Sequence, residues 1–222
     1  MADDIFLTPE EQDERAKKWL RENGPAIAIG IVLGLGGIYG YDEYRKHQQS
    51  QAEEASYAYG QILEVIQESD LTDITSQVET LTADYAGTPF ASKAMLLKAK
   101  QLSLTDVDAA IEALDWVLEN AEEQPVWHAA NIRRAKMLLS KEGQAQSVIA
   151  SLEKVDHEGY ASHYLEVVGD AYVQLGEDEQ AVASYQAAID ALTPADAGYT
   201  RILTLKQNGV RRAESNADNE SS

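Results

Sequence analysis

The side chains that could bind a metal ion are few in this sequence and stand far apart. The histidines are His47, His128, His157 and His163. A zinc site of the His-x-x-x-His type needs two histidines on one helix face, and the six-residue spacing of His157 and His163 does not provide that. The sequence contains no cysteine, which excludes thiolate ligands, thiolate chemistry and a disulfide framework. We therefore predict no metal site.

Acidic pairs are the other candidates for chemistry, because two carboxylates can act as general acid and base. Glu53-Glu54 and Glu122-Glu123 are such pairs, but charged runs in helical sequences are usually solvated faces. No glycine-rich phosphate loop and no nucleophile motif is present. We predict no catalytic residue and no cofactor, so the chain is not expected to be an enzyme.

The net charge of −20 is unevenly distributed. Residues 1–22 contain seven acids and four bases, which leaves thirty-one acids and fourteen bases, or −17, for residues 42–222. Such an acidic domain repels phosphate backbones, so nucleic acid is not an expected partner. The negative charge could attract basic protein partners, and salt would then weaken that attraction; alternatively, the charge serves solubility alone.

No charged residue occurs between Glu22 and Asp42. This uncharged, apolar run sets the boundaries of the domains that we predict. A helix over residues 23–41 is roughly 28 Å long, which nearly matches the hydrocarbon core of a bilayer. We predict a transmembrane helix that contacts lipid through residues 23–41. It divides the chain into a leader (1–22), the span (23–41), a helical domain (42–207) and a disordered tail (208–222).

A cleaved signal peptide and a buried helix of a soluble protein both fit this apolar run less well than a membrane span does. A signal peptide has a basic leader and a shorter apolar core, followed by a small-x-small cleavage site; here the leader is acidic, and Gly34-Leu-Gly36 lies inside the run. A buried soluble helix would not favour five glycines, whereas membrane helices tolerate them. Gly30 and Gly34 fit the small-xxx-small motif of packed spans, as do Gly36 and Gly40. They indicate either self-association or an ordinary glycine-rich anchor.

Lysine and arginine near the span predict its orientation. Four basic residues precede the span and two follow it: Arg15, Lys17, Lys18 and Arg21, then Arg45 and Lys46. This bias favours a cytoplasmic N-terminus and an external C-terminal domain. In the leader, Thr8-Pro9-Glu10-Glu11 has the form of a capping box, which predicts a short helix from Pro9 to Arg21.

After the span, apolar residues recur at helical spacing, so the fold class is all-α. Residues 163–194 fit the tetratricopeptide pattern, with Gly169, Ala181 and Ala188 at the close crossing of two helices. Gly143 precedes Gly176 by 33 residues, close to one repeat, although Lys136 occupies the expected position of the first glycine. We predict three to four stacked helical pairs, whose first helices line a concave contact face. These first helices are Thr88–Leu104, Pro125–Leu139 and Tyr160–Leu175. A closing helix is expected over Ala195–Lys206.

Four segments together resemble the YfgM family: WLRENGPAIAIGIVLGLGGIYGYDEYRKHQ, QAEEASYAYGQIL, LDWVLENAEE and GDAYVQLGEDEQAVASYQAAI. Members of that family are ancillary subunits of the SecYEG translocon with one N-terminal span and a periplasmic domain resembling tetratricopeptide repeats. The resemblance extends from Trp19 to Leu192. It implies an inner-membrane interaction protein that passes exported proteins from SecYEG to periplasmic chaperones.

Three functions are compatible with these residues. The first is the interaction module at the export machinery that the resemblance implies. The second is an envelope scaffold of the same architecture that serves another assembly or division complex. The third, a hydrolase or metal-binding domain on a membrane anchor, has the least support in the residues.

Overall fold

The computed structural model describes residues 9–68 and 73–220, and within these ranges it contains helices and no strand. The predicted all-α fold is confirmed. Two short 3-10 helices, Glu158–Tyr160 and Pro194–Tyr199, accompany the α-helices. The α-helices are α1 (Pro9–Glu68), α2 (Thr75–Asp84), α3 (Pro89–Leu102), α4 (Val107–Asn120), α5 (Gln124–Leu139), α6 (Ala145–Leu152), α7 (Ala161–Leu175), α8 (Asp178–Asp190) and α9 (Thr200–Glu220).

The first helix is longer than the sequence predicts. We expected a leader helix that ends at Arg21 and a separate span, but α1 continues from Pro9 to Glu68 with Pro25 inside it. Proline removes only one backbone N–H, and membrane helices tolerate it. The predicted capping residue Thr8 lies outside the described residues.

The chain divides into two compact units, Met1–Glu53 and Glu54–Ser222. The division falls inside α1, beyond the boundary predicted at residue 42. Its cause is packing, because Ala55 and Ile62 are almost completely buried in a core with α2 and α3, whereas the helix before residue 51 is mostly exposed. Tyr85 of the second unit also donates a 2.9 Å hydrogen bond to Glu54.

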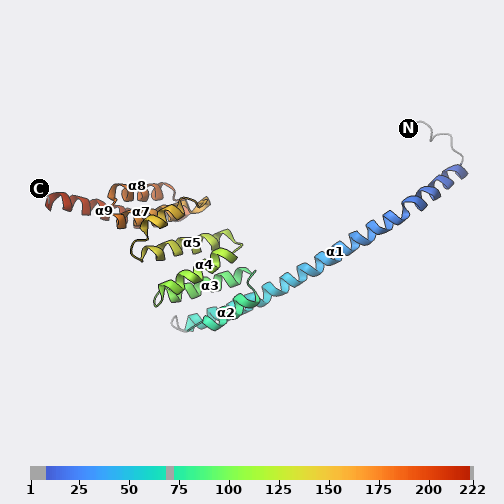
Figure 1. The fold of residues 1–222 in the computed structure, drawn as a ribbon, viewed down its shortest axis with the longest axis horizontal. Helices are drawn as coiled ribbons and strands as arrows, with labels where there is room; N and C mark the ends of the chain where they lie inside the picture. Colours follow the sequence, from blue (N-terminus) through green and yellow to red (C-terminus); the bar gives the residue numbers. More distant parts are fainter. Residues whose placement is uncertain (1–8, 69–72, 221–222) are drawn as a thin grey trace, which may run out of the picture. The chain divides into compact units, whose positions relative to one another are not determined.

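Unit 2 is a series of antiparallel helical pairs. The end of α1 packs with α2, and the pairs α3/α4, α5/α6 and α7/α8 follow in order along the chain (Figure 1). Each pair also contacts the next one; for example, α4 contacts α5. This arrangement confirms the predicted stack of tetratricopeptide-like hairpins.

Local sequence signals explain where these helices begin and end. Thr88 and Asp106 cap α3 and α4 by accepting hydrogen bonds from the amides of Ala91 and Ala109. Gly143 and Gly176 have φ values of +75° and +71°, a left-handed conformation that favours glycine after a helix. Their 33-residue spacing thus marks the same turn in two successive pairs.

The pair α7/α8 has the closest helix crossing that we find at a glycine. A Cβ atom on Gly169 would lie 2.7 Å from the ring of Tyr185, which is 2% exposed. Ala181 and Ala188 are fully buried on the same helix as Tyr185. The predicted close approach at Gly169 is therefore present, and an aromatic ring fills the gap that the missing side chain leaves.

The C-terminal segment differs from the prediction. We expected a helix over Ala195–Lys206 followed by a disordered tail over 208–222, but α9 extends from Thr200 to Glu220. Leu203, Gln207 and Val210 form a buried stripe at helical spacing, and α9 packs on α8 through it. The polar composition after Gly209 concealed this continuation, and residues 221 and 222 lie outside the described residues.

Candidate functional site

The four histidines are not gathered at one place. His47 is exposed on α1, whereas His128 of α5 is buried and its Nδ1 lies 2.8 Å from the hydroxyl of Tyr164. The His157 ring stacks on Tyr164 with centroids 4.6 Å apart, and the His163 ring stacks on Tyr199. Within the described residues, no group of three or more His, Asp or Glu side chains could hold a metal ion. The rings of His128, His157 and His163 thus pack against tyrosines of neighbouring elements.

The paired acids are also separated. Glu53 accepts a hydrogen bond from Gln49 on the exposed surface of α1, and Glu54 accepts one from Tyr85. Glu122 and Glu123 lie in the connection between α4 and α5. The two pairs belong to different helical pairs and do not form one carboxylate site.

The apolar run lies on α1 in unit 1. Among the described residues, α1 is the one helix long and apolar enough to cross a membrane, and none of its apolar window is buried by protein. Val32, Leu33 and Ile38 are each 69–70% exposed. Because such a surface is costly in water, a bilayer is the solvent that fits it.

A groove crosses the first helices of the later pairs, the face that we predicted for contacts. It has a volume of about 380 Å³ and is lined by residues of α5, α7 and α9. These residues are Lys136, Leu139, Ser140, Asp170, Gln174 and Lys206. Gln174 donates a hydrogen bond of 2.8 Å to the carbonyl of Leu139, which ties α7 to α5 at the edge of the groove. The closing helix that the sequence predicted, here α9, adds a wall through Lys206; its contact with this face was not predicted.

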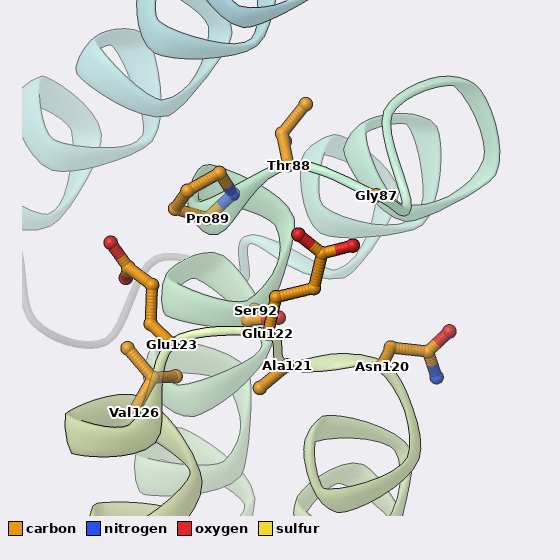
Figure 2. A pocket seen from close by; sticks show the side chains of 9 residues that line it. All are labelled: Gly87, Thr88, Pro89, Ser92, Asn120, Ala121, Glu122, Glu123 and Val126. Atoms are coloured by element: carbon orange, nitrogen blue, oxygen red, sulfur yellow. The ribbon is translucent and has the colours of Figure 1, made fainter.

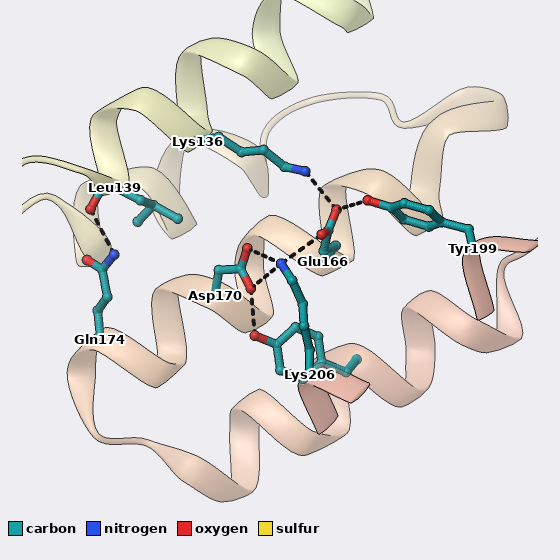
Figure 3. Close-up of polar contacts among 8 residues, drawn as sticks. Lys136, Leu139, Glu166, Asp170, Gln174, Tyr199 and Lys206 are labelled. Atoms are coloured by element: carbon teal, nitrogen blue, oxygen red, sulfur yellow. Dashed lines mark hydrogen bonds and ion pairs between the residues drawn. The ribbon is translucent and has the colours of Figure 1, made fainter. Parts of the chain in front are cut away.

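Beneath this groove lies a buried carboxylate, Glu166 of α7, whose side chain is only 3% exposed (Figure 3). Lys136 of α5 donates to it over 2.8 Å, Tyr199 over 2.6 Å and Lys206 of α9 over 2.7 Å. Lys206 also donates to both carboxylate oxygens of Asp170, at 2.7 and 2.8 Å. We call these five residues the Glu166 network; it links three helices with no net charge.

The network shifts the protonation of its members. Burial acts to raise the pKa of Glu166, but the hydrogen bonds from Lys136, Lys206 and Tyr199 outweigh it and lower that pKa to about 2. Burial raises the pKa of Tyr199, and its hydrogen bond to Glu166 raises it further. For Lys206, burial acts to lower the pKa, yet the two carboxylates raise it. Near neutral pH, Glu166 and Lys206 are therefore charged, whereas Tyr199 is neutral.

Sequence reasoning identified only one member of this network as unusual. Lys136 departs from the repeat pattern, since it stands 33 residues before Gly169 where a glycine is expected. The structure explains the departure, because Lys136 reaches across to Glu166 of the next pair. A further signal was available in Glu166 itself, an acid between the apolar positions Leu165 and Val167 on a predicted inner helix face.

This arrangement suits binding rather than catalysis. Lys136 uses one of its three N–H groups on Glu166, and Gln174 uses one of two on Leu139. Lys136, Leu139 and Gln174 all line the groove, so it offers both hydrogen-bond donors and an apolar residue. A polypeptide backbone or an acidic side chain could use them. The residues at this face thus define a candidate docking groove on a stack of helical pairs.

One candidate membrane span followed by stacked helical pairs defines the class, an α-solenoid protein with one apolar N-terminal helix. More specifically, the chain belongs to the tetratricopeptide repeat-like domain family, whose model matches residues 17–212. That match includes the apolar helix as well as the pairs.

Several curated relatives cover most of the chain and are each named ancillary SecYEG translocon subunit. The Escherichia coli (strain K12) protein is 25% identical over 208 residues, which is 93% of this chain and 98% of the relative. The Haemophilus influenzae protein is 24% identical over 183 residues, or 82% and 89% of the two chains. The Aggregatibacter actinomycetemcomitans protein is 28% identical over 185 residues, or 82% and 90%. The predicted resemblance to the YfgM family is confirmed, and no solved structure matches the chain.

Proposed function

We propose that this protein is an ancillary, non-enzymatic subunit of the SecYEG translocon, held in the inner membrane by α1. The proposal rests on the extent of the match to the Escherichia coli relative, which includes 98% of that protein. The same architecture, one apolar helix and then helical pairs, fits association within the membrane and polypeptide contacts outside it.

The test is to purify the full chain in mild detergent after crosslinking in the membrane and to identify its neighbours. We expect SecY, SecE and SecG to be recovered with the full chain. The matched control is fragment 42–222 directed to the periplasm, which should recover much less of them. Recovery of a division or envelope-assembly complex in place of SecYEG would favour the scaffold alternative.

We also propose that unit 2 faces the periplasm and passes exported proteins to periplasmic chaperones. The acidic surface of residues 42–222, at −17, suits basic segments of unfolded clients or a basic chaperone surface. The groove over the Glu166 network lies on the face that solenoids use for contacts. Gly30 and Gly34 of α1 are the proposed site of self-association in the membrane, because a Cβ atom added at either position would meet no atom within 4 Å from elsewhere in the described residues.

The orientation gives a direct prediction. Because four basic residues precede the span and two follow it, the N-terminus is expected in the cytoplasm. Protease added to intact spheroplasts should remove an epitope placed at the C-terminus and leave one at the N-terminus protected. A cytoplasmic marker protein serves as the control for intact membranes. Survival of the C-terminal epitope until the membrane is permeabilised would reverse the assignment.

A further inference from the structure

The charges of unit 2 are divided between the first and the second helices of its pairs. The second helices α2, α4 and α8 contain two, four and three acids and no base. The first helices α3 and α5 contain three bases each and no acid. The first helix α7 contains Glu166 and Asp170, which Lys136 and Lys206 neutralise. The charge of −17 for residues 42–222 therefore does not describe the first helices.

The first helices lie on the inner side of the stack. The first helix α3 contacts α5, and α5 contacts α7, whereas within the described residues no comparable contact joins α2 to α4, α4 to α6 or α6 to α8. A stack that is tighter on one side curves toward that side, so the first helices line the concave face, the usual contact surface of a solenoid. The groove across α5, α7 and α9 belongs to this face.

Four of the six bases on α3 and α5 are paired with acids. Lys93 pairs at 3.1 Å with Glu123, which lines a pocket between the turn before α3 and the connection between α4 and α5 (Figure 2). The other pairs are Lys98–Glu79, Arg134–Asp115 and Lys136–Glu166. Lys100 and Arg133 are exposed, and neither forms an ion pair with a described residue. Two such bases are unexpected in residues 42–222, where acids outnumber bases by thirty-one to fourteen.

The repeat register places Lys100 on the concave face. Lys98 and Arg134 hold equivalent positions, because each pairs with an acid 19 residues earlier on the preceding second helix. Two residues after them on the same helices stand Lys100 and Lys136. Lys136 lines the groove and pairs with Glu166 of the next first helix. Lys100 has no such partner, because the first helix that follows it, α5, contains no acid.

Arg133 lies on the same side of α5 as Lys136. The two residues are three positions apart on one helix, and residues at that spacing are neighbours on its surface. Arg133 therefore stands beside the groove residue Lys136, on the helix that α3 contacts. The concave face thus presents bases of α3 and α5 where one pair later it presents a base and an acid.

We propose that Lys100 of α3 and Arg133 of α5 bind an acidic segment of a polypeptide partner. Side-chain carboxylates of that segment provide for these two bases what Glu166 provides for Lys136. Complementary charge then fixes which partner this face accepts, and its sign is opposite to the one that the net charge suggests. The proposal names the partner's chemistry for the polypeptide-contact role proposed for unit 2, and it rests on that role.

The test uses the full chain in detergent micelles and three capped peptides that differ only in charge. Their sequence is Ac-Gly-X-Ala-X-Ala-X-Gly-NH₂, with glutamate, glutamine or lysine at X. The glutamate peptide should shift the backbone amide NMR signals of Ala99 and Ile132, which are next to the two bases, and the glutamine peptide should leave them unchanged. Raising the salt from about 0.05 M to about 0.5 M should reverse the shifts, because it shortens the distance over which charges interact.

Single substitutions then assign the binding to these two bases. Lys100→Gln and Arg133→Gln should each weaken binding of the glutamate peptide by about two- to fivefold, the size of one exposed ion pair. Their melting temperatures should equal that of the wild type, since neither base pairs with a described acid. Lys154→Gln is the matched control, because Lys154 is an exposed base in the turn after α6, outside the first helices; this variant should bind like the wild type.

Three results would overturn the proposal: equal shifts with the glutamate and glutamine peptides, larger shifts with the lysine peptide, or unchanged affinity in both Lys100→Gln and Arg133→Gln. The crosslinking experiment measures neighbours in the membrane and is independent of these peptides. Failure to recover SecYEG would therefore leave the peptide result unaffected, and absence of peptide binding would leave the translocon assignment standing.

Discussion

Acidification from about pH 5 to about pH 2 is expected to remove about 3 kcal/mol from the free energy of unfolding of unit 2 through Glu166 alone. The reason is the difference between its pKa in the folded protein, about 2, and the ordinary value of 4.5. Because the folded pKa is the lower one, the contribution is fully present above pH 4.5. The contribution disappears as the pH falls from about 4.5 toward about 2, the pKa of Glu166 in the folded protein.

Urea unfolding of fragment 42–222, followed by circular dichroism from neutral to acid pH, measures this effect. Glu166→Gln should be less stable than the wild type at neutral pH, because Lys136 and Lys206 lose their charged acceptor. The difference should shrink as the wild-type carboxylate becomes protonated. Glu142→Gln removes an exposed acid and should follow the wild-type curve. A gap between Glu166→Gln and wild type that stays constant with pH would contradict the assignment.

The position of the Glu166 network gives this pH effect a functional consequence. Three residues of the network, Lys136, Asp170 and Lys206, also line the groove. Any change that breaks the network therefore loosens α9 and alters the groove wall at the same time. We therefore expect stability and binding at this face to be coupled, and the Glu166→Gln variant should be assayed for both.

Local signals in the sequence were sufficient for most of the fold. Thr88 and Asp106 cap helices where the capping rules predict them, and Gly143 and Gly176 occupy left-handed turns one repeat apart. These features depend on a few neighbouring residues, so a single sequence contains them. The apolar helix is equally local, because no other segment lacks charge over a comparable length.

The features that the sequence did not reveal depend on contacts between distant segments. Lys136, Glu166 and Lys206 are 30 and 40 residues apart, and nothing in the repeat pattern pairs them. The continuation of α9 past the predicted end at Lys206 likewise involves burial of Gln207 and Val210, which the polar composition did not suggest. Tertiary packing decided these cases, and local propensity was a weak guide.

The crossing of α7 and α8 leads to the second large effect. Gly169→Ala is expected to destabilise unit 2 by about 1–3 kcal/mol, because the new methyl group would overpack the crossing. The Cβ atom would meet three ring atoms of Tyr185 at 2.7 to 3.1 Å. The ring cannot easily withdraw, since it is buried and its hydroxyl donates a 2.6 Å hydrogen bond to Asp170.

The same substitution elsewhere in a helix should have the opposite sign. Gly60→Ala, also in a helix of unit 2 but with no atom within 4 Å of the added Cβ, should stabilise the fragment by up to about 1 kcal/mol. Urea unfolding of fragment 42–222 carrying each substitution provides the comparison. Equal effects of the two substitutions would show that α7 and α8 do not cross as closely as described.

A double-mutant cycle identifies the ring as the cause. Tyr185→Leu removes the atoms that the new methyl group would meet, so Gly169→Ala should cost much less in that background than in the wild type. Tyr185→Leu alone will also destabilise the domain, because it leaves a cavity and removes the hydrogen bond to Asp170. The informative quantity is therefore the coupling between the two substitutions. A coupling near zero would place the close contact of Gly169 somewhere other than Tyr185.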